Sequence, residues 1–292
     1  APLYWREADG GWTAFGLRGA QPVDADAPVA FTRSLRETGF AVLKGHPIAA
    51  ERIDAAYADW ARFFASDEKD AFRAGPGGAA GYFPFRTENA KGARHKDLKE
   101  FFQVYPGTRL PPESAEVTKG LYGDLMEIGA TLLAWLDEHA PAETRRGFSE
   151  PLTSMLRGSN ECMLRIIHYP ALDNVEVEEG AVRAAAHEDI NLITLLLSGS
   201  APGLEAQDQS GNWHAVPCDR GMIVVNAGDM LQLASGGAFP STTHRVVNPE
   251  SGGGARFSMP MFVHPRPEVA LAPDKSAGQY LHERLVEIGL AT

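Results

Sequence analysis

The stretch His187–Leu197, HEDINLITLLL, joins a His-x-Asp motif to a continuous apolar run. Residues such as Ile, Leu and Thr in a short run of this kind favour a buried β-strand. In an extended chain, residues i and i+2 point to the same side. His187 and Asp189 can therefore face one ion while Glu188 faces away.

Seven further short runs with β character lie around this stretch, separated by Gly, Pro, Asn and Asp. They are CMLRIIHY (162–169), GLEAQD (203–208), WHAV (213–216), MIVVNA (222–227), DMLQL (229–233), STTHRVV (241–247) and RFSMPMFV (256–263). Many short strands punctuated by turn residues predict a sandwich or a closed barrel.

The first half of the chain has helical patterning instead. Apolar residues at steps of three and four predict helices over 27–38, 49–65 and 114–139, a further helix from Pro141 that ends before Gly158, and a closing helix over 276–290. GFAVLKG (39–45) predicts a strand, and 73–96 an irregular loop. Without a flexible linker, we expect one domain over 1–292, with a helical region (1–157), a β core (158–270) and a C-terminal helix (271–292).

Composition narrows the class of protein. The formal net charge of −11 offers no basic face for nucleic acid. No apolar run has the roughly 18 residues that a membrane span needs, and the N-terminal stretch lacks the pattern of a secretion signal. Two cysteines cannot build a disulfide scaffold. We expect a cytoplasmic monomer with no nucleic-acid or membrane partner.

A third ligand for an ion at His187 and Asp189 is available in His244, within STTHRVV. Two His and one carboxylate on one side of a metal form the facial triad of non-haem Fe(II) oxygenases, although the same set can hold Zn²⁺. Nine His and 38 acidic residues give about one His-x-acid by chance. The second copy, His95–Asp97, lies in a polar, helix-like segment, where i and i+2 do not share a face. On pattern alone, ordinary histidines remain the alternative.

A possible carboxylate clamp follows on the next β run. Arg256 and Ser258 share a face by the same parity, and a guanidinium offers a carboxylate two parallel donors. The alternative is a surface arginine at a sheet edge. In the loop, Tyr82, Phe83 and Arg86 are candidates for lining a substrate mouth, against the alternative of a plain surface loop.

Taken in order, these segments resemble the Fe(II)/2-oxoglutarate-dependent oxygenases of the isopenicillin N synthase-like family. The resemblance rests on HEDINLITLLL, VVNAGDMLQL, STTHRVVNP, Arg256-x-Ser258, HYP (168–170) and RETGFAVLKGHPI (36–48). It implies a mixed α and β fold, with a double-stranded β-helix (jelly-roll) core and flanking helices. It also implies Fe(II) held by His187, Asp189 and His244, and 2-oxoglutarate held by Arg256, Ser258 and Tyr169.

The implied reaction is the oxidation of a small-molecule substrate by O₂, through hydroxylation, desaturation or ring formation, with release of succinate and CO₂. Two alternatives stay open: an isopenicillin N synthase-like oxidase or cyclase that uses no 2-oxoglutarate, and a non-catalytic jelly-roll binding protein. Ala79 stands where that synthase has an arginine, two residues before its Gly-Tyr pair, which favours 2-oxoglutarate. The sequence departs from the family at Ser235-Gly236-Gly237, usually Ser-Asn-Gly, and in a longer interval between His244 and Arg256.

Overall fold

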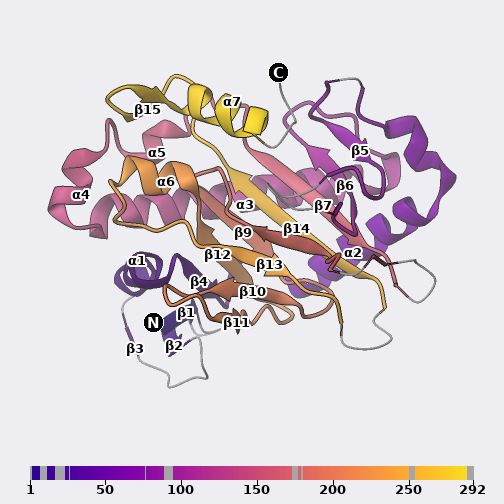
Figure 1. Ribbon diagram of the computed structural model, residues 1–292, viewed down its shortest axis with the longest axis horizontal. Coiled ribbons are helices and arrows are strands. Elements are labelled where there is room, and N and C mark those ends of the chain that lie inside the picture. The colour runs from indigo at the N-terminus through magenta and orange to yellow at the C-terminus, as the bar shows by residue number, and fades with distance from the viewer. Residues whose placement is uncertain are drawn as a thin grey trace.

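Two antiparallel sheets that face each other form the centre of the computed structural model (Figure 1). The structure describes residues 27–75, 77–88, 95–172, 177–178, 180–249 and 254–287, and the backbone of three N-terminal strands. Those strands, β1 (Pro2–Arg6), β2 (Trp12–Gly16) and β3 (Asp24–Ala25), pair in a separate small sheet.

The larger sheet has seven strands. In spatial order they are β4 (Phe40–Leu43), β12 (Ile223–Ala227), β9 (Ile193–Leu197), β14 (Arg256–Val263), β7 (Met163–Tyr169), β6 (Glu100–Val104) and β5 (Gly81–Phe83). β9 and β12 are buried at every position, which matches their unbroken apolar character. Strands from the helical region predicted at 1–157 therefore share this sheet with strands of the predicted β core.

The smaller sheet has four strands, in the order β11 (Trp213–Ala215), β10 (Leu204–Gln207), β13 (His244–Val246) and β8 (Ala184–His187). Between the sheets lies an apolar cluster to which both contribute, here called the inter-sheet core. Its buried members are Phe40, Val42, Phe101, Ile167, Tyr169, Ala184, Leu196, Leu204, Ala206, Val216, Met222, Val224 and Val246. Two antiparallel sheets closed around one core make a jelly-roll, so the predicted fold class is confirmed.

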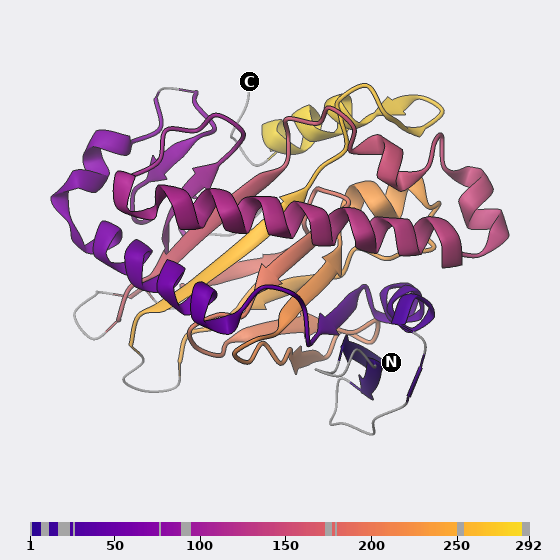
Figure 2. The ribbon, with the colours of Figure 1, turned by 180° about the vertical axis from the view of Figure 1, so that it is seen from behind.

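Helices cover the outer face of the seven-stranded sheet, where α3 (Pro112–His139) crosses β9 and β14 (Figure 2). Gly129 brings α3 close, because a Cβ there would lie 3.2 Å from Val263 Cγ2. The remaining elements are α1 (Ala27–Thr38), α2 (Ala50–Ala65), the 3₁₀ helix η1 (Asp67–Phe72), α4 (Ala142–Gly147), α5 (Leu152–Met155), α6 (Asp229–Ala234), α7 (Ala277–Glu287), β15 (Ala270–Ala272) and β16 (Lys275–Ser276). The helices predicted at 27–38, 49–65 and 114–139 are confirmed, and 276–290 is confirmed as far as it is described.

The prediction of a strand over DMLQL (229–233) is wrong, because these residues form the helix α6. The cause lies at Gly228, where the chain turns out of the sheet against Asn191. A Cβ at Gly228 would lie 2.2 Å from the Asn191 carbonyl oxygen, so only glycine allows this approach. The Gly228 N–H then bonds to Leu192 O at 2.9 Å.

Three smaller predictions also need correction. The helix expected from Pro141 is two short helices, α4 and α5. The expected loop over 73–96 contains the strand β5, which is paired with β6, while residues 76 and 89–94 lie outside the described part. The segment around His95 is not helical where it is described, because residues 95–99 form bends and irregular backbone that lead into β6.

Candidate metal centre

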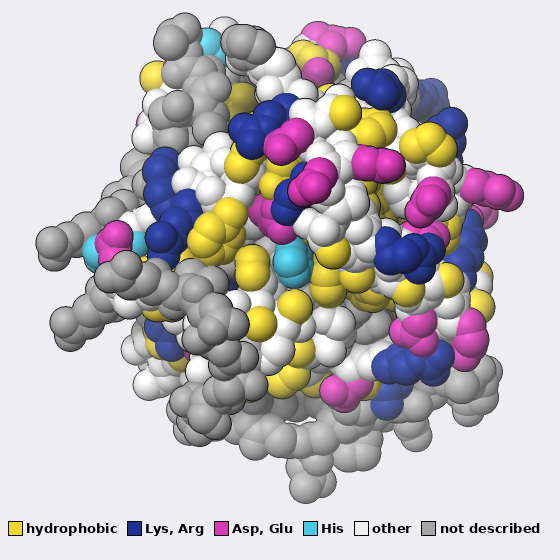
Figure 3. Space-filling view, turned by 90° about the vertical axis from the view of Figure 1, so that its right-hand side faces the viewer, with side chains coloured by type: hydrophobic (Ala, Val, Ile, Leu, Met, Phe, Trp, Pro, Cys, Tyr) yellow, Lys and Arg dark blue, Asp and Glu magenta, His cyan; other side chains and the backbone are white. Residues whose placement is uncertain are grey.

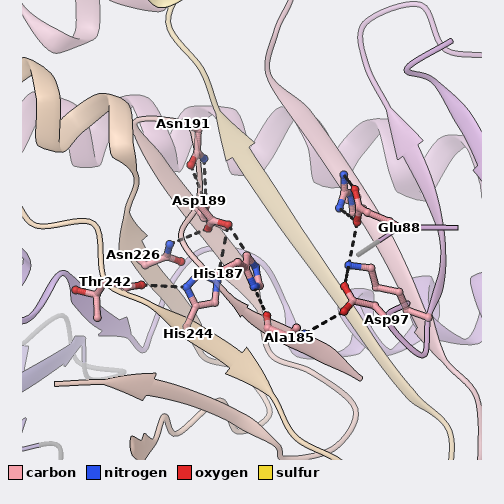
Figure 4. Close-up of polar contacts among 12 residues, drawn as sticks. Glu88, Asp97, Ala185, His187, Asp189, Asn191, Asn226, Thr242 and His244 are labelled. Carbon is pink, nitrogen blue, oxygen red and sulfur yellow. Dashed lines mark hydrogen bonds and ion pairs between the residues drawn. The ribbon is translucent and has the colours of Figure 1, made fainter. Parts of the chain in front are cut away.

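Three side chains predicted as metal ligands meet at the end of the smaller sheet (Figure 4). His187 ends β8, Asp189 follows it in the connection to β9, and His244 begins β13 directly opposite His187. Asp189 Oδ1 lies 3.9 Å from His187 Nε2 and 3.8 Å from His244 Nε2. These separations are too long for hydrogen bonds, and one potential ligand atom from each residue lies within 4.8 Å of the other two.

Backbone carbonyls orient both imidazole rings. His187 Nδ1 lies 2.7 Å from Ala185 O, and His244 Nδ1 lies 3.1 Å from Thr242 O. Since a carbonyl only accepts, each Nδ1 carries the proton and each Nε2 keeps a lone pair. The lone pairs are the ones that face Asp189, which is the arrangement of histidine ligands in metal proteins.

Two hydrogen bonds fix the Asp189 carboxylate from behind. Oδ2 accepts from Thr194 Oγ1 at 2.6 Å and from Asn226 Nδ2 at 2.8 Å. Thr194 and Asn226 are register partners on β9 and β12, and Asn191 donates to Thr194 at 3.0 Å. The other carboxylate oxygen of Asp189, Oδ1, faces the two imidazole rings.

The electrostatics favour a bound cation. Burial, followed by the nearby His244, lowers the pKa of His187 to about 4, so its imidazole is neutral at pH 7. Burial acts to raise the pKa of Asp189, but the two histidines and the hydrogen bonds from Asn226 and Thr194 lower it overall. Two imidazoles and one carboxylate suit a divalent transition metal and leave positions open on its other side.

The predicted clamp lies on β14, within the larger sheet. Arg256 is 1% exposed and Ser258 is buried. Arg256 pairs in register with Tyr169 of β7, and its guanidinium lies 5.1 Å from the centre of that ring. Its Nε donates to Ala201 O at 3.0 Å, while its buried Nη1 has no partner among the described residues. A buried guanidinium with a free donor is suited to an anion such as a carboxylate.

The three residues predicted to line a substrate mouth have different surroundings in the structure. Tyr82 is 3% exposed and packs against Phe63 and Phe64 of α2, while its hydroxyl bonds to Glu100. Phe83 instead stacks on Phe101 of the inter-sheet core, with ring centroids 4.8 Å apart. Arg86 is half-buried and has a positive φ of 61°. The placement of Tyr82 argues for a structural role, and that of Phe83 brings it to the core that holds Tyr169.

A network of four charges borders the centre; Asp97 and Lys99 are buried, whereas Glu88 and Arg165 are partly buried. Glu88 Oε2 lies 2.9 Å from Lys99 Nζ and 3.0 Å from Arg165 Nη1. Lys99 also pairs with Asp97 at 2.8 Å, and Asp97 Oδ1 accepts from the Ala185 N–H at 3.1 Å. The Ala185 peptide therefore joins this network to His187 (Figure 4). The sequence did not predict this network, because Asp97 and Lys99 meet Glu88 and Arg165 only through tertiary contacts.

Comparison with known proteins gives a consistent result. The sequence profile of the 2OG-Fe(II) oxygenase superfamily matches residues 160–265, and that of a non-haem dioxygenase N-terminal region, described from morphine synthesis, matches 20–122. A solved Shewanella oneidensis protein assigned as an oxygenase is 43% identical, with a TM-score of 0.82, over 91% of this chain and 96% of its own.

Two further relatives support the same comparison. A solved 2OG-Fe(II) oxygenase family protein from Caulobacter crescentus is 32% identical, with a TM-score of 0.73, over 88% of this chain and 95% of its own. The clavatol oxidase claD of Penicillium crustosum is 27% identical over 86% of this chain and 83% of its own. Among the residues that the structure describes, none of the helices is both long and apolar enough to cross a membrane.

Proposed function

Because the chain belongs to the 2OG-Fe(II) oxygenase superfamily, we propose that His187, Asp189 and His244 are its iron ligands. The enzyme is an Fe(II)- and 2-oxoglutarate-dependent dioxygenase that acts on a small molecule. The observation that carries the assignment is the convergence of one carboxylate oxygen and two imidazole lone pairs, each held by its own hydrogen bonds.

We assign 2-oxoglutarate binding to Arg256, with Ser258 and Tyr169 beside it. The free Nη1 of Arg256 supplies the donor that the far carboxylate of this cosubstrate requires. Gly199 leaves room for the guanidinium, because a Cβ there would lie 3.1 Å from Arg256 Nη2. The inter-sheet core excludes water from this end of the site and strengthens each charge-assisted bond.

The remaining protein groups position the reactants. Bound iron supplies the oxygen chemistry that couples decarboxylation of 2-oxoglutarate, to succinate and CO₂, with oxidation of the substrate. Asp189 occupies the ligand position that a halide would need, so we assign hydroxylation, desaturation or ring formation rather than halogenation. We assign substrate contact to Phe83. Substrate contact by Tyr82, whose burial argues for a structural role, and by Arg86 stays a sequence-based prediction.

We extend the proposal to partners and organisation. Lysine and arginine side chains alternate with acidic ones on the face in Figure 3, and no broad basic patch for nucleic acid forms there. Cys162 and Cys218 are free thiols, which supports a reducing compartment such as the cytoplasm. The shared seven-stranded sheet supports one oxygenase domain. A monomeric state without a membrane partner stays a prediction.

The test supplies Fe(II), O₂ and 2-oxoglutarate labelled at C1 to the purified chain, with and without a library of small molecules. We expect slow release of labelled CO₂ alone, and faster release with succinate when the substrate is present. Arg256→Ala should raise the KM for 2-oxoglutarate by at least tenfold, because a charge-assisted bond is worth about 1.5–3 kcal/mol. Oxygen uptake driven by a substrate alone, without any labelled CO₂, would overturn the proposal.

A further inference from the structure

A second buried arginine lies close to Arg256. Arg183 comes directly before β8 and is 2% exposed. Its Nη2 donates to Gly254 O at 2.7 Å, and Gly254 precedes Arg256 by two residues. The Arg183 side chain therefore reaches from the smaller sheet to the start of β14.

Among the described residues, neither guanidinium has a carboxylate partner. Arg183 Nε and Arg256 Nη1 are buried without a hydrogen-bond partner among the described residues. None of the ion pairs found in the described part of the chain involves either arginine. Burial, followed by the charge of Arg256, lowers the pKa of Arg183.

Two buried cations that repel each other, each with an unused N–H, are costly unless an anion joins them. The ring of Tyr169 lies beneath Arg256 and also interacts electrostatically with Arg183. The free donors thus belong to the end of the site that we assigned to the cosubstrate. A carboxylate placed there relieves the repulsion between the two arginines and satisfies both donors.

We propose that Arg183 is a second guanidinium of the cosubstrate pocket and binds the far carboxylate of 2-oxoglutarate together with Arg256. This inference rests on the proposed function. It makes the pocket selective for 2-oxo acids whose tail is anionic, beyond the selectivity that Arg256 alone gives. A carboxylate on the oxidised substrate has the same chemistry, and the experiment separates the two sources.

The experiment compares two ligands on the full chain loaded with Mn(II). Calorimetry measures the Kd of 2-oxoglutarate and of 2-oxopentanoate, in which a methyl group replaces the far carboxylate. The variants are Arg183→Gln and Arg183→Lys. Arg220→Gln removes the same charge at an exposed position, where Arg220 pairs with Glu51 and Asp54, and serves as the matched control.

We expect Arg183→Gln to weaken 2-oxoglutarate binding by at least about tenfold and to leave 2-oxopentanoate within about twofold. The Kd of Arg183→Lys for 2-oxoglutarate should lie between those of wild type and Arg183→Gln. If the glutamine variant does not fold, the lysine variant is used in its place. Equal weakening of both ligands, or no change in either, overturns the inference. An unchanged Kd for 2-oxoglutarate with a raised KM for an acidic substrate assigns Arg183 to the substrate and also overturns it. If wild type binds no 2-oxoglutarate, the proposed function itself fails.

Discussion

The chain contains two His-x-Asp tripeptides, and the molecule uses them differently. At 187–189, both side chains turn toward His244 and one potential ion position. At 95–97, the His95 ring pairs with Glu178 near the surface, whereas Asp97 is buried and pairs with Lys99. Yet the two tripeptides lie side by side, because Ala185 donates its N–H to Asp97 and accepts from His187 with its carbonyl.

The difference lies in which cation compensates each buried carboxylate. Lys99 already compensates Asp97. Among the described residues, Asp189 forms no ion pair with a lysine or arginine, and the two imidazoles lie 3.9 and 3.8 Å from its Oδ1. A buried carboxylate without a resident cation is costly, so the charges around Asp189 favour a bound cation and are consistent with the proposed metal site. The same His-x-Asp pattern is therefore surrounded by different charges at its two positions.

The largest expected effect follows from removing one of the proposed histidine ligands of the metal. His187→Ala or His244→Ala should lower Fe(II) affinity by more than about 100-fold, since loss of outer-shell partners alone costs 10–100-fold. Turnover should fall to background. Anaerobic Fe(II) titration measures the affinity, and His95→Ala is the matched control. Wild-type affinity in both ligand variants would refute the assignment.

The next effect concerns stability. Asp97→Asn removes the charge that pairs with Lys99 and weakens the acceptor of the Ala185 N–H. Breaking a buried pair by removing one partner costs about 3–5 kcal/mol. Denaturant unfolding of the metal-free protein should show this loss. Asp219→Asn, at an exposed position, should stay within about 0.5 kcal/mol, and an equal loss in both variants would contradict the role of the network.

A pH titration tests the charge network that compensates Asp97, through its member Glu88. Burial acts to raise the pKa of Glu88, but Arg165 and Lys99 lower it overall, to about 2. A lowered folded-state pKa means that this contribution, about 3 kcal/mol, is present above the unfolded value near 4.5 and is lost as pH falls toward 2. The free energy of unfolding should show this loss in wild type between pH 5 and 2. If the free energy of unfolding of Glu88→Gln falls with pH as steeply as that of wild type, Glu88 is not the origin of the loss.

The smallest effect tests the support behind Asp189. Asn226→Ala removes one of the two hydrogen bonds to Oδ2, and we expect a 10–100-fold loss of metal affinity. The fold should survive because Thr194 still holds the carboxylate. Asn212→Ala, in an exposed turn, provides the control and should leave the metal affinity unchanged. If Asn226→Ala and Asn212→Ala bind the metal equally tightly, Asn226 does not support the metal site.

Much of the fold was predictable because its signals are local. The apolar runs of β7, β9, β12 and β14 each occupy one short stretch, and the facial parity of Arg256 and Ser258 follows from their spacing. DMLQL was not separable from a strand, since a short, mostly apolar run of five residues fits either structure. Its helix depends on the contact of Gly228 with Asn191, which only the folded chain brings together.

The candidate site divides in the same way. The proposed ligands are predictable as residue types in a pattern, because His-x-Asp and a following His belong to two short β segments. Their supports are not predictable. Thr194 and Asn226 reach Asp189 from two strands, while Asp97 and Arg183 become relevant only through tertiary contacts with Ala185 and Gly254.

The pairing of β8 with β13 also bears on the lifetime of the protein. His187 and His244 are 57 positions apart in the sequence and become neighbours only when these strands pair. Closing such a loop has an entropic cost, so the unfolded chain holds this set of ligands together poorly. Metal that binds only the folded chain adds about 2.7 kcal/mol of stability at 100 times its Kd. Iron scarcity would then shorten the survival of the protein against proteolysis while it stops the reaction.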